Sequence, residues 1–376
     1  MSVLTRSKIS QIVVDISNVQ SKATLVNDCI QIALNRAYQF HDWPYFLVDG
    51  HFNTWATYET GTIAITQYAT TATITTGVVT SDFVEAKIRI GTDRAWYRIS
   101  SVNTVANTIT LDAQYSESTV TAATYVIFND EFALAPDLDK YKTLRQFQNG
   151  IPMMDVTPQS LDIAYPVPQN YADPVINAMV GSTQYQYTTG TLSGTGTTIT
   201  GAGTEWASDV HLTQLGNMSL IRVGSNVYTI KSVDSDTQIT TYENVGTIAA
   251  LSTYTIMMNN LMVQLYQIPN ALRTIRYRYF RIPNPLANDY DVPDMPHEFH
   301  HLLIWGALSE VLSQKGDINK SYQIYEARFN EGLNLMKMKI GTFAPNRITV
   351  RRSTGTSRTR RLDGLETSNF SSRYSS

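Results

Sequence analysis

Apolar positions are densest between residues 295 and 340, and their pattern predicts a pair of helices there. Pro296 suits the first turn of a helix, because the N–H that it lacks would be unpaired at that position. Nearly every position from 299 to 312 is apolar, and a helix that is apolar on all sides must be covered on all sides. Lys315 and Gly316 favour a helix end. The short link that follows predicts a second, antiparallel helix.

The second helix of this pair carries two apolar stripes. The first stripe recurs at alternating spacings of three and four residues, which predicts a narrow seam packed on the first helix. Its positions are Ile318, Tyr322, Tyr325, Phe329, Leu333, Met336 and Ile340. A thinner stripe lies off this seam and favours contact with another subunit. We expect the pair to be too apolar for a lone molecule and to be buried between identical copies. The candidate subunit-interface residues are Leu302, Trp305, Leu308, Ile324, Leu335 and Met338.

The beginning of the chain also has helical periodicity. Apolar residues between positions 9 and 16 predict a short helix that ends at Ser17 and Asn18. A stronger pattern predicts a helix over residues 24–41, and Pro44 ends it because the residue before a proline avoids the α region. Alternating apolar positions after residue 46 then predict a strand.

Two later segments, residues 57–129 and 189–259, contain short alternations of Thr, Val and Ile separated by Gly, Asp and Asn. This pattern is typical of small all-β units, each a barrel or a sandwich. The two segments also resemble each other, and at roughly 70 residues each could fold alone. The matched positions are Ile88 with Ile221, Tyr97 with Tyr228, Ile99 with Ile230, Ser101 with Ser232, Val102 with Val233, Ile109 with Ile239, and Ile127 with Ile256.

Together these elements predict an α+β fold. We expect a discontinuous helical-bundle core with a small sheet, two all-β modules inserted in surface loops of that core, and an extended C-terminal arm. The predicted divisions are core at 1–56, 130–188 and 260–340, modules at 57–129 and 189–259, and the arm at 341–376. The last core segment is expected to contain a β-hairpin, between residues 263 and 282, before the helix pair.

Composition narrows the class of protein. The chain has 376 residues, of which 43% are hydrophobic, enough for real cores. A net charge of −3 gives no overall basic field for tight duplex DNA binding. The single cysteine, Cys29, leaves no disulfide within the chain. We find no signal peptide and no apolar run of about 18 residues, so we expect synthesis in a cytoplasm and no membrane span.

Residues 341–376 lack apolar periodicity and are rich in Ser, Thr and Arg. Such a composition does not fold alone and is typical of an arm that becomes ordered on a partner. Nucleic acid is the alternative partner, which would require several phosphate contacts. The candidate binding residues of this arm are Arg347, Arg351, Arg352, Arg358, Arg360, Arg361, Phe370, Arg373 and Tyr374.

Two further patterns could carry chemistry. His297, Glu298 and His301 satisfy the H-E-x-x-H spacing of zinc proteases. Because Pro296 places this motif in the first turn of a helix, and no third ligand follows at the expected spacing, a plain helix start is favoured over a zinc hydrolase. A row of four arginines between residues 273 and 281 could meet phosphates, but a solvated or salt-bridged strand face is favoured. We predict no catalytic residues, no metal, no cofactor and no enzyme activity.

Three stretches in the core, residues 34–46, 265–285 and 291–335, occur in an order that resembles the head-to-tail adaptor (connector) proteins of tailed double-stranded DNA bacteriophages, particularly short-tailed ones. Residues 190–206 are similar to a β module that is common in phage tail and neck proteins. In that family the proteins form a twelve-subunit ring below the portal, with a helical core around the DNA channel. The C-terminal arm docks on the portal, and peripheral domains carry tail parts or fibres.

The resemblance implies a non-enzymatic adaptor ring in the neck of the virion, assembled in the host cytoplasm. Its expected partners are further copies of the chain, twelve in a ring by family analogy, the portal protein, the tail nozzle protein and tail fibres. Double-stranded DNA would pass through the ring at ejection without sequence-specific binding. A closed ring is the natural product of a heterologous interface whose rotation closes. The alternative function is a fibre or receptor-binding tail protein whose β modules face a host surface.

Overall fold

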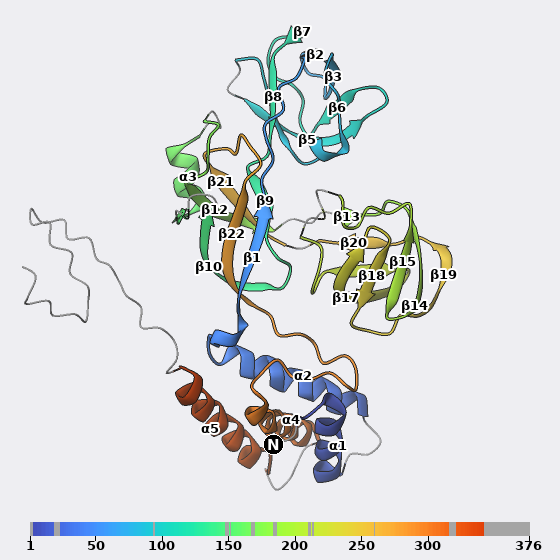
Figure 1. Cartoon of the computed structure of the whole chain (residues 1–376), viewed down its shortest axis with the longest axis vertical. Helices are drawn as coiled ribbons and strands as arrows, with labels where there is room; N and C mark the ends of the chain where they lie inside the picture. The colour runs from blue at the N-terminus through green and yellow to red at the C-terminus, as the bar shows by residue number, and fades with distance from the viewer. Residues whose placement is uncertain are drawn as a thin grey trace, which may run out of the picture.

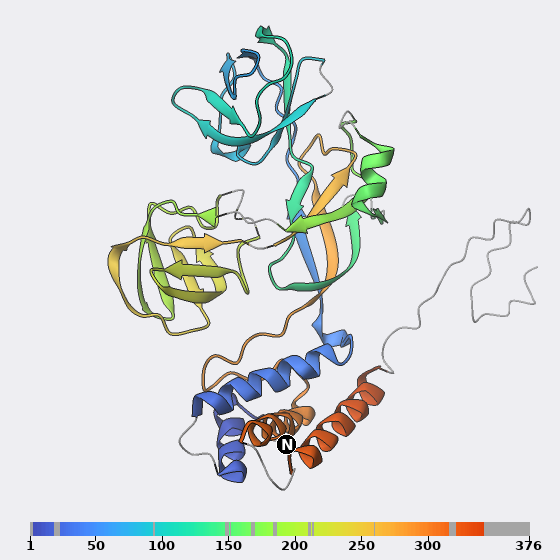
Figure 2. The ribbon, with the colours of Figure 1, turned by 180° about the vertical axis from the view of Figure 1, so that it is seen from behind.

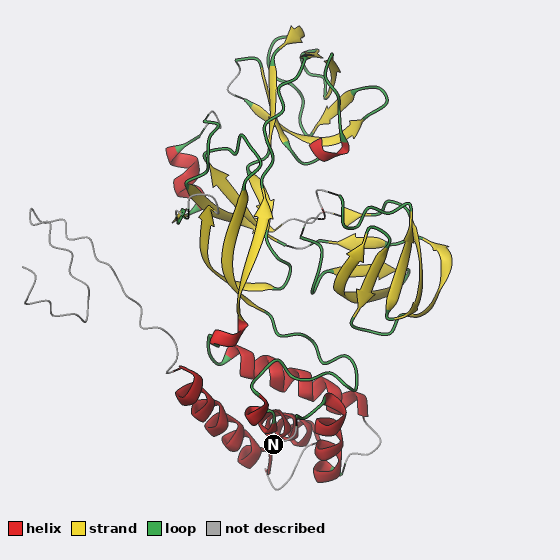
Figure 3. Cartoon of the chain, viewed as in Figure 1, coloured by secondary structure: helices red, strands yellow, loops and turns green. Residues whose placement is uncertain are grey.

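The structure is a computed structural model that describes residues 3–18, 23–92, 95–146, 150, 152–166, 170–182, 186–209, 212, 214–258, 260–315 and 321–341. As expected, the chain has mixed α and β content, with most of its regular structure in strands that form several sheets (Figure 3). A helical domain lies at one end of the molecule and an all-β module at the other (Figure 1). A β sandwich lies between them, and a second β module lies beside this sandwich.

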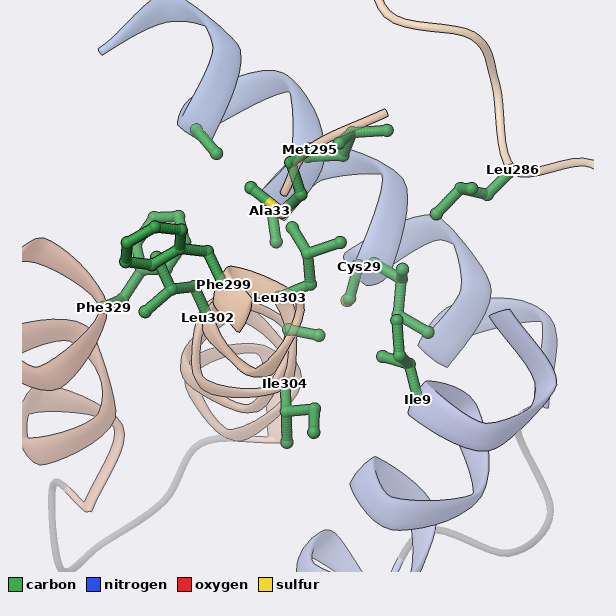
Figure 4. Close-up of a cluster of buried hydrophobic side chains, with 14 of the residues drawn as sticks. Ile9, Cys29, Ala33, Leu286, Met295, Phe299, Leu302, Leu303, Ile304 and Phe329 are labelled. Atoms are coloured by element: carbon green, nitrogen blue, oxygen red, sulfur yellow. The ribbon is translucent and has the colours of Figure 1, made fainter. Parts of the chain in front are cut away.

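The helical domain combines the two ends of the described chain. Its helices are α1 (Arg6–Ser17), α2 (Ala23–Gln39), α4 (His301–Lys315) and α5 (Ser321–Gly341), and the 3-10 turn η4 (His297–Phe299) precedes α4. The side chain of Thr5 caps the start of α1 by accepting from the Lys8 amide, and Asn18 ends this helix in the left-handed conformation. Helix α4 lies among the other three helices (Figure 4).

The β sandwich has two sheets. One contains β1 (Leu47–Asn53), β22 (Thr274–Arg281) and β10 (Leu138–Gln146), in that order; the 3-10 turn η1 (Pro44–Phe46) leads into it. The other contains β11 (Met154–Val156), β12 (Ile176–Ser182), β21 (Leu261–Tyr266) and β9 (Glu131–Ala133), with the short helix α3 (Pro158–Ala164) beside β12. Both sheets contribute to one apolar core, which includes Phe52, Leu144, Ile275, Phe132 and Val263. Seen from behind, β1 and β22 connect this sandwich to the helical domain (Figure 2).

The predicted hairpin between residues 263 and 282 is wrong. Strands β21 and β22 belong to different sheets, although they follow one another in sequence. The link between them pairs with a distant segment, because the Ile268 amide donates to the Asn170 carbonyl at 2.9 Å and the Ala172 amide donates to the Ile268 carbonyl at 2.9 Å. Most of the regular structure described between residues 130 and 182 is also β sandwich, so this part of the chain does not contribute to the helical bundle.

The first β module contains seven strands and the 3-10 turn η2 (Ser81–Phe83). Its strands are β2 (Thr62–Ile65), β3 (Thr71–Thr75), β4 (Lys87–Ile90), β5 (Trp96–Asn103), β6 (Thr108–Leu111), β7 (Val120–Ala123) and β8 (Tyr125–Phe128). They are ordered β7-β2-β3-β6-β5-β4-β8, around an apolar core of their own.

The second β module contains eight strands and also has its own core. Its strands are β13 (Gln186–Tyr187), β14 (Thr191–Gly196), β15 (Thr198–Ala202), β16 (Leu220–Val223), β17 (Asn226–Ser235), β18 (Gln238–Thr241), β19 (Gly246–Ser252) and β20 (Thr255–Met257). This module lies between β12 and β21, which pair antiparallel from Ser182 and Leu261 onward. It therefore occupies the connection of a hairpin.

The two modules share strand registers at the positions that match in sequence. The pairs that coincide, in the first and second module respectively, are Ile88–Tyr97 and Ile221–Tyr228, Ile88–Ile127 and Ile221–Ile256, and Val102–Ile109 and Val233–Ile239. A register shift also falls at the same place, between Ile99 and Ser101 in β5 and between Ile230 and Ser232 in β17. A shared bulge at matched positions indicates a common supersecondary plan, since bulges are specific features of a fold.

A buried charge cluster joins the first module to the sandwich. The Lys87 ammonium group, on β4, lies 2.8 Å from Asp130 and 2.6 Å from Glu131, at the start of β9. Glu131 also pairs with Arg98 of β5 at 2.8 Å. These charges are largely out of water, so each depends on the others for compensation.

Hydrogen bonds join the second module to the sandwich and to the link that leads to the helices. The Tyr242 hydroxyl lies 2.6 Å from the Asn217 side-chain oxygen and 2.8 Å from that of Asn284. Asn217 donates to Asp137 at 3.3 Å, and Asn288 donates to the Tyr242 carbonyl at 2.8 Å. The second module is thus held by side chains from both neighbouring parts.

Candidate functional site

Helix α4 packs very closely on its neighbours. A β-carbon added at Gly306 would lie 2.8 Å from the Ala33 side chain of α2, and one added at Gly332 of α5 would lie 2.1 Å from Leu302. Glycine at these two positions therefore lets three helices approach one another more closely than side chains would permit.

The chain itself covers α4, which corrects the interface prediction. Leu302 and Leu308 are 0% exposed and belong to the core of the helical domain (Figure 4, in which Leu302 is labelled). They cannot contact another subunit while this domain is folded. The physical reason is that α1 and α2, from the other end of the chain, supply the cover that the apolar helix requires. Trp305 is half-buried, and its ring meets the His301 ring edge-on at 4.8 Å between centroids.

Helix α5 has the predicted seam on its inner face. Phe329, Leu333 and Met336 are buried against the core, while Tyr325 and Ile340 pack at its edge. This confirms the seam for these five residues; Tyr322 is half-buried, and Ile318 lies outside the described residues. An ionic contact reinforces the packing, because Arg36 of α2 pairs with Glu310 of α4 at 2.6 Å and Glu326 of α5 at 3.2 Å.

The outer face of α5 carries the remaining interface candidates. Ile324 is 59% exposed, Leu335 is 53% exposed and Met338 is 61% exposed. Three large apolar side chains on one helix face that is open to solvent indicate an interaction surface.

An open groove of about 510 Å³ adjoins this face at the end of α5. Glu298, Phe299, Leu335, Met338 and Lys339 line it. The ion pair between Lys339 and Glu298 lies on its rim and is well exposed, so it contributes little stability. The groove thus extends the apolar outer face of α5 toward the N-terminal turn of α4.

The predicted portal-binding arm lies outside the described residues. Its candidates are Arg347, Arg351, Arg352, Arg358, Arg360, Arg361, Phe370, Arg373 and Tyr374. The last described residue is Gly341, at the end of α5. The arm therefore continues from the same end of the helix that carries the groove.

The H-E-x-x-H residues have other contacts. Glu298 pairs with Lys339, and His301 packs on Trp305. His300, between them, is buried, and its Nε2 lies 2.9 Å from the Met295 carbonyl oxygen; burial lowers the pKa of His300. Within the described part of the chain, no group of three or more His, Cys, Asp and Glu residues is placed to hold a metal ion.

The arginine row, which begins at Arg273 just before β22 and continues along that strand, forms salt bridges. Arg273 pairs with Asp173 at 2.7 Å, Arg278 with Asp49 at 2.8 Å and Arg281 with Asp294 at 3.1 Å. The interpretation as a salt-bridged strand face is therefore confirmed for these three residues.

The polar junctions of the two modules were not found from the sequence. Lys87 shares strand β4 with a second cation, Arg89, and the adjacent carboxylates of Asp130 and Glu131 were the available signal for its partners. Asn217 and Asn284 carry no such signal, because they are distant in sequence and uncharged.

None of the helices that the structure describes is long and apolar enough to cross a membrane. An exposed apolar helix face, on a chain that also carries two β modules, is typical of a protein that associates with other proteins. Residues 176–360 match the family model described as SU10 adaptor protein. This part of the chain belongs to that family, and the chain is a bacteriophage head-to-tail adaptor and a component of the virion. No curated protein matches the sequence.

The family match covers defined parts of the fold. It begins at β12 and includes the second module, strands β21 and β22 and the helices α4 and α5. Of the stretches that carry the resemblance, residues 190–206, 265–285 and 291–335 lie within it, whereas residues 34–46 lie outside. The first module also lies outside the match.

Proposed function

We propose that the chain is one subunit of a closed ring that joins the phage portal to the tail nozzle and surrounds the DNA channel. The match of residues 176–360 to an adaptor family carries this proposal, because it covers both the helix pair and the second β module. Twelve copies per ring is the number that the resemblance implies. We place assembly in the host cytoplasm.

The exposed part of the helical domain supplies the surface for subunit contacts in this proposal. On α5, the apolar side chains of Ile324, Leu335 and Met338 are exposed to water, and Trp305 of α4 is half-buried. A ring needs a heterologous contact, so these residues would meet a different surface of the next subunit. The net charge of −3 suits a channel along which DNA slides, since tight binding needs many cationic phosphate contacts.

The arm and the β modules would provide the contacts to other proteins. Residues 341–376 would dock on the portal through their arginines, which can make bidentate bonds to carboxylates. The modules project from the sandwich, and their surfaces would receive tail parts or fibres (Figure 1).

Electron microscopy of the purified chain mixed with its portal tests the ring. Rings on the portal, with the helical domain toward the channel, are the expected result. Persistent separation of chain and portal at micromolar concentrations of both would contradict the function.

A truncation tests the arm separately. A chain ending at Gly341 keeps all described helices and should lose portal binding, while circular dichroism should show unchanged helix content. Two matched full-length variants separate the effect of the positive charge from that of the guanidinium geometry. In one, all seven arm arginines are changed to Gln, and in the other all are changed to Lys. If the truncated chain bound the portal with full affinity, the arm would not be needed for portal binding.

A further inference from the structure

The outer face of α5 has a second regularity besides its apolar residues. Exposed positions recur at spacings of four, three, four and three residues along one face; they are Ile324, Arg328, Glu331, Leu335 and Met338. This is the spacing of a coiled-coil seam, in which alternate spacings of three and four keep side chains toward one partner helix. The inner seam of α5 is already occupied by α4, whereas the outer seam is open to solvent and available to a partner helix.

The middle of this outer seam is charged. Arg328 and Glu331 are the second and third of its five positions, and neither forms an ion pair with another described residue. Charges at such positions weaken association unless the partner helix supplies the opposite charge at the same level. The seam therefore selects its partner by charge as well as by apolar contact.

The same sequence read in the opposite direction meets this requirement. In an antiparallel pair of α5 helices centred between Phe329 and Asn330, Arg328 faces Glu331 of the second copy, and Glu331 faces its Arg328. At the next levels outward, Ile324 faces Leu335 of the second copy. A parallel pair would instead place Arg328 against Arg328 and Glu331 against Glu331, which is repulsive.

We propose that the outer face of α5 binds the outer face of α5 in a second copy of this chain, antiparallel and across a two-fold axis. The charges fix the register of the two helices. If one helix slid along the other by seven residues, Leu335 would face Glu331 or Ile324 would face Arg328, depending on the direction, and the opposite charges would no longer face each other. The flanking positions Ala327 and Asn334 are small or uncharged and add no repulsion.

This pair belongs to the free subunit, and it does not rest on the proposed ring. A two-fold contact is isologous and closes with two copies, whereas a ring around DNA repeats a heterologous contact. The same stripe cannot serve both at once. Pairing would therefore shield the apolar stripe before assembly and would have to open when subunits join the ring. The seam from Ile324 to Met338 is short, about 21 Å at 1.5 Å per residue, so the dimer should be reversible and concentration-dependent.

Sedimentation of the full chain without portal, over a range of concentrations, tests the pairing. We expect a monomer–dimer equilibrium and no larger species. The single variants Arg328→Glu and Glu331→Arg should each raise the dimer dissociation constant at least about tenfold, because each brings like charges together. The double variant R328E/E331R should restore it. An equimolar mixture of the two single variants should form a mixed dimer, because every facing pair in it is then opposite in charge.

Cross-linking fixes the orientation. In a Cys29→Ser background, a mixture of Ile324→Cys and Leu335→Cys chains should form a covalent dimer more readily than either alone, as expected for neighbouring antiparallel positions. Because these positions are exposed, the changes leave the helical core intact, and circular dichroism checks this. Monomers at all concentrations, a dimer insensitive to charge reversal, or cross-links only between identical positions would each overturn the proposal. Portal binding is measured separately, so a chain that forms no ring on the portal would not change the conclusion about the α5 pair.

Discussion

Replacing Lys87 with Met tests how firmly the first β module is fixed to the sandwich. The Lys87 side chain is only 4% exposed, and its ammonium lies 2.8 Å from Asp130 and 2.6 Å from Glu131. Methionine fills a similar volume but removes the cation, leaving two buried carboxylates with less compensation. Asp130 would keep the amide of Gln264 at 2.9 Å, and Glu131 would keep Arg98. Removing one partner of a buried pair costs about 3–5 kcal/mol.

Hydrogen exchange measures this cost where it arises. Amides in β4 and β9, the strands on the two sides of the junction, should exchange faster by roughly one hundredfold to a few thousandfold, the equivalent of 3–5 kcal/mol in the opening free energy. Strands far from the junction, such as β14 and β15 of the second module, should be unchanged, because they share no contacts with the cluster.

Lys140→Met is the matched control. Lys140 also pairs with a carboxylate, that of Asp42, at 2.7 Å, but the two side chains are 51% and 41% exposed. An exposed ion pair contributes at most about 1 kcal/mol. Equal small effects of the two substitutions would refute the reasoning, because they would mean that burial of Lys87 does not make its ion pairs stronger.

The remaining predictions concern acid stability and packing. Burial alone would raise the pKa of Glu131. The neighbouring cations Lys87 and Arg98 outweigh this effect, so the pKa of Glu131 is lowered. Its stabilising contribution should be complete above the ordinary glutamate pKa and be lost as the pH falls from there through the lowered pKa of the folded chain, which protease susceptibility of the junction will measure. Gly332→Val should destabilise the helical domain by about 1–3 kcal/mol in thermal unfolding, because a β-carbon there would lie 2.1 Å from Leu302, whereas Ala327→Val on the exposed face should cost much less. Trp206→Phe should cost about 1–2 kcal/mol in chemical unfolding of the second module, because it removes the indole N–H that donates to the Tyr254 hydroxyl at 2.9 Å in a buried site.

Periodic features of the fold could be predicted from the sequence. The inner seam of α5 follows from the spacing of Phe329, Leu333 and Met336, because residues three and four apart share a helix face. The matched positions of the two β modules also have the same strand partners, as the pairs Ile88–Tyr97 and Ile221–Tyr228 illustrate. Alternation along a strand fixes which face is buried, so a repeated alternation carries a repeated register.

Pairings between distant segments could not be predicted. Both β21 and β22 have strand-like patterns, but the pattern does not state which strand each will join, and the chain order favoured a hairpin that does not form. The same limit applies to the bond between Asn217 and Asn284, where two neutral side chains meet at 3.1 Å across the junction of the second module. Hydrogen bonds of this kind depend on geometry that only the folded chain defines.

The apolar pattern of helix α4 does not determine which molecule covers the helix. Its sequence states that Leu302, Leu308 and their neighbours must be covered, but not by which molecule. The structure supplies the cover from α1 and α2, so the apolar surface that the helix pair itself leaves available to other molecules is the stripe on α5 and its groove. The smaller surface changes the expected behaviour. A wholly exposed hairpin would drive irreversible association, whereas three exposed apolar side chains around a charged centre favour contacts that form and open, as a subunit that assembles on another structure requires.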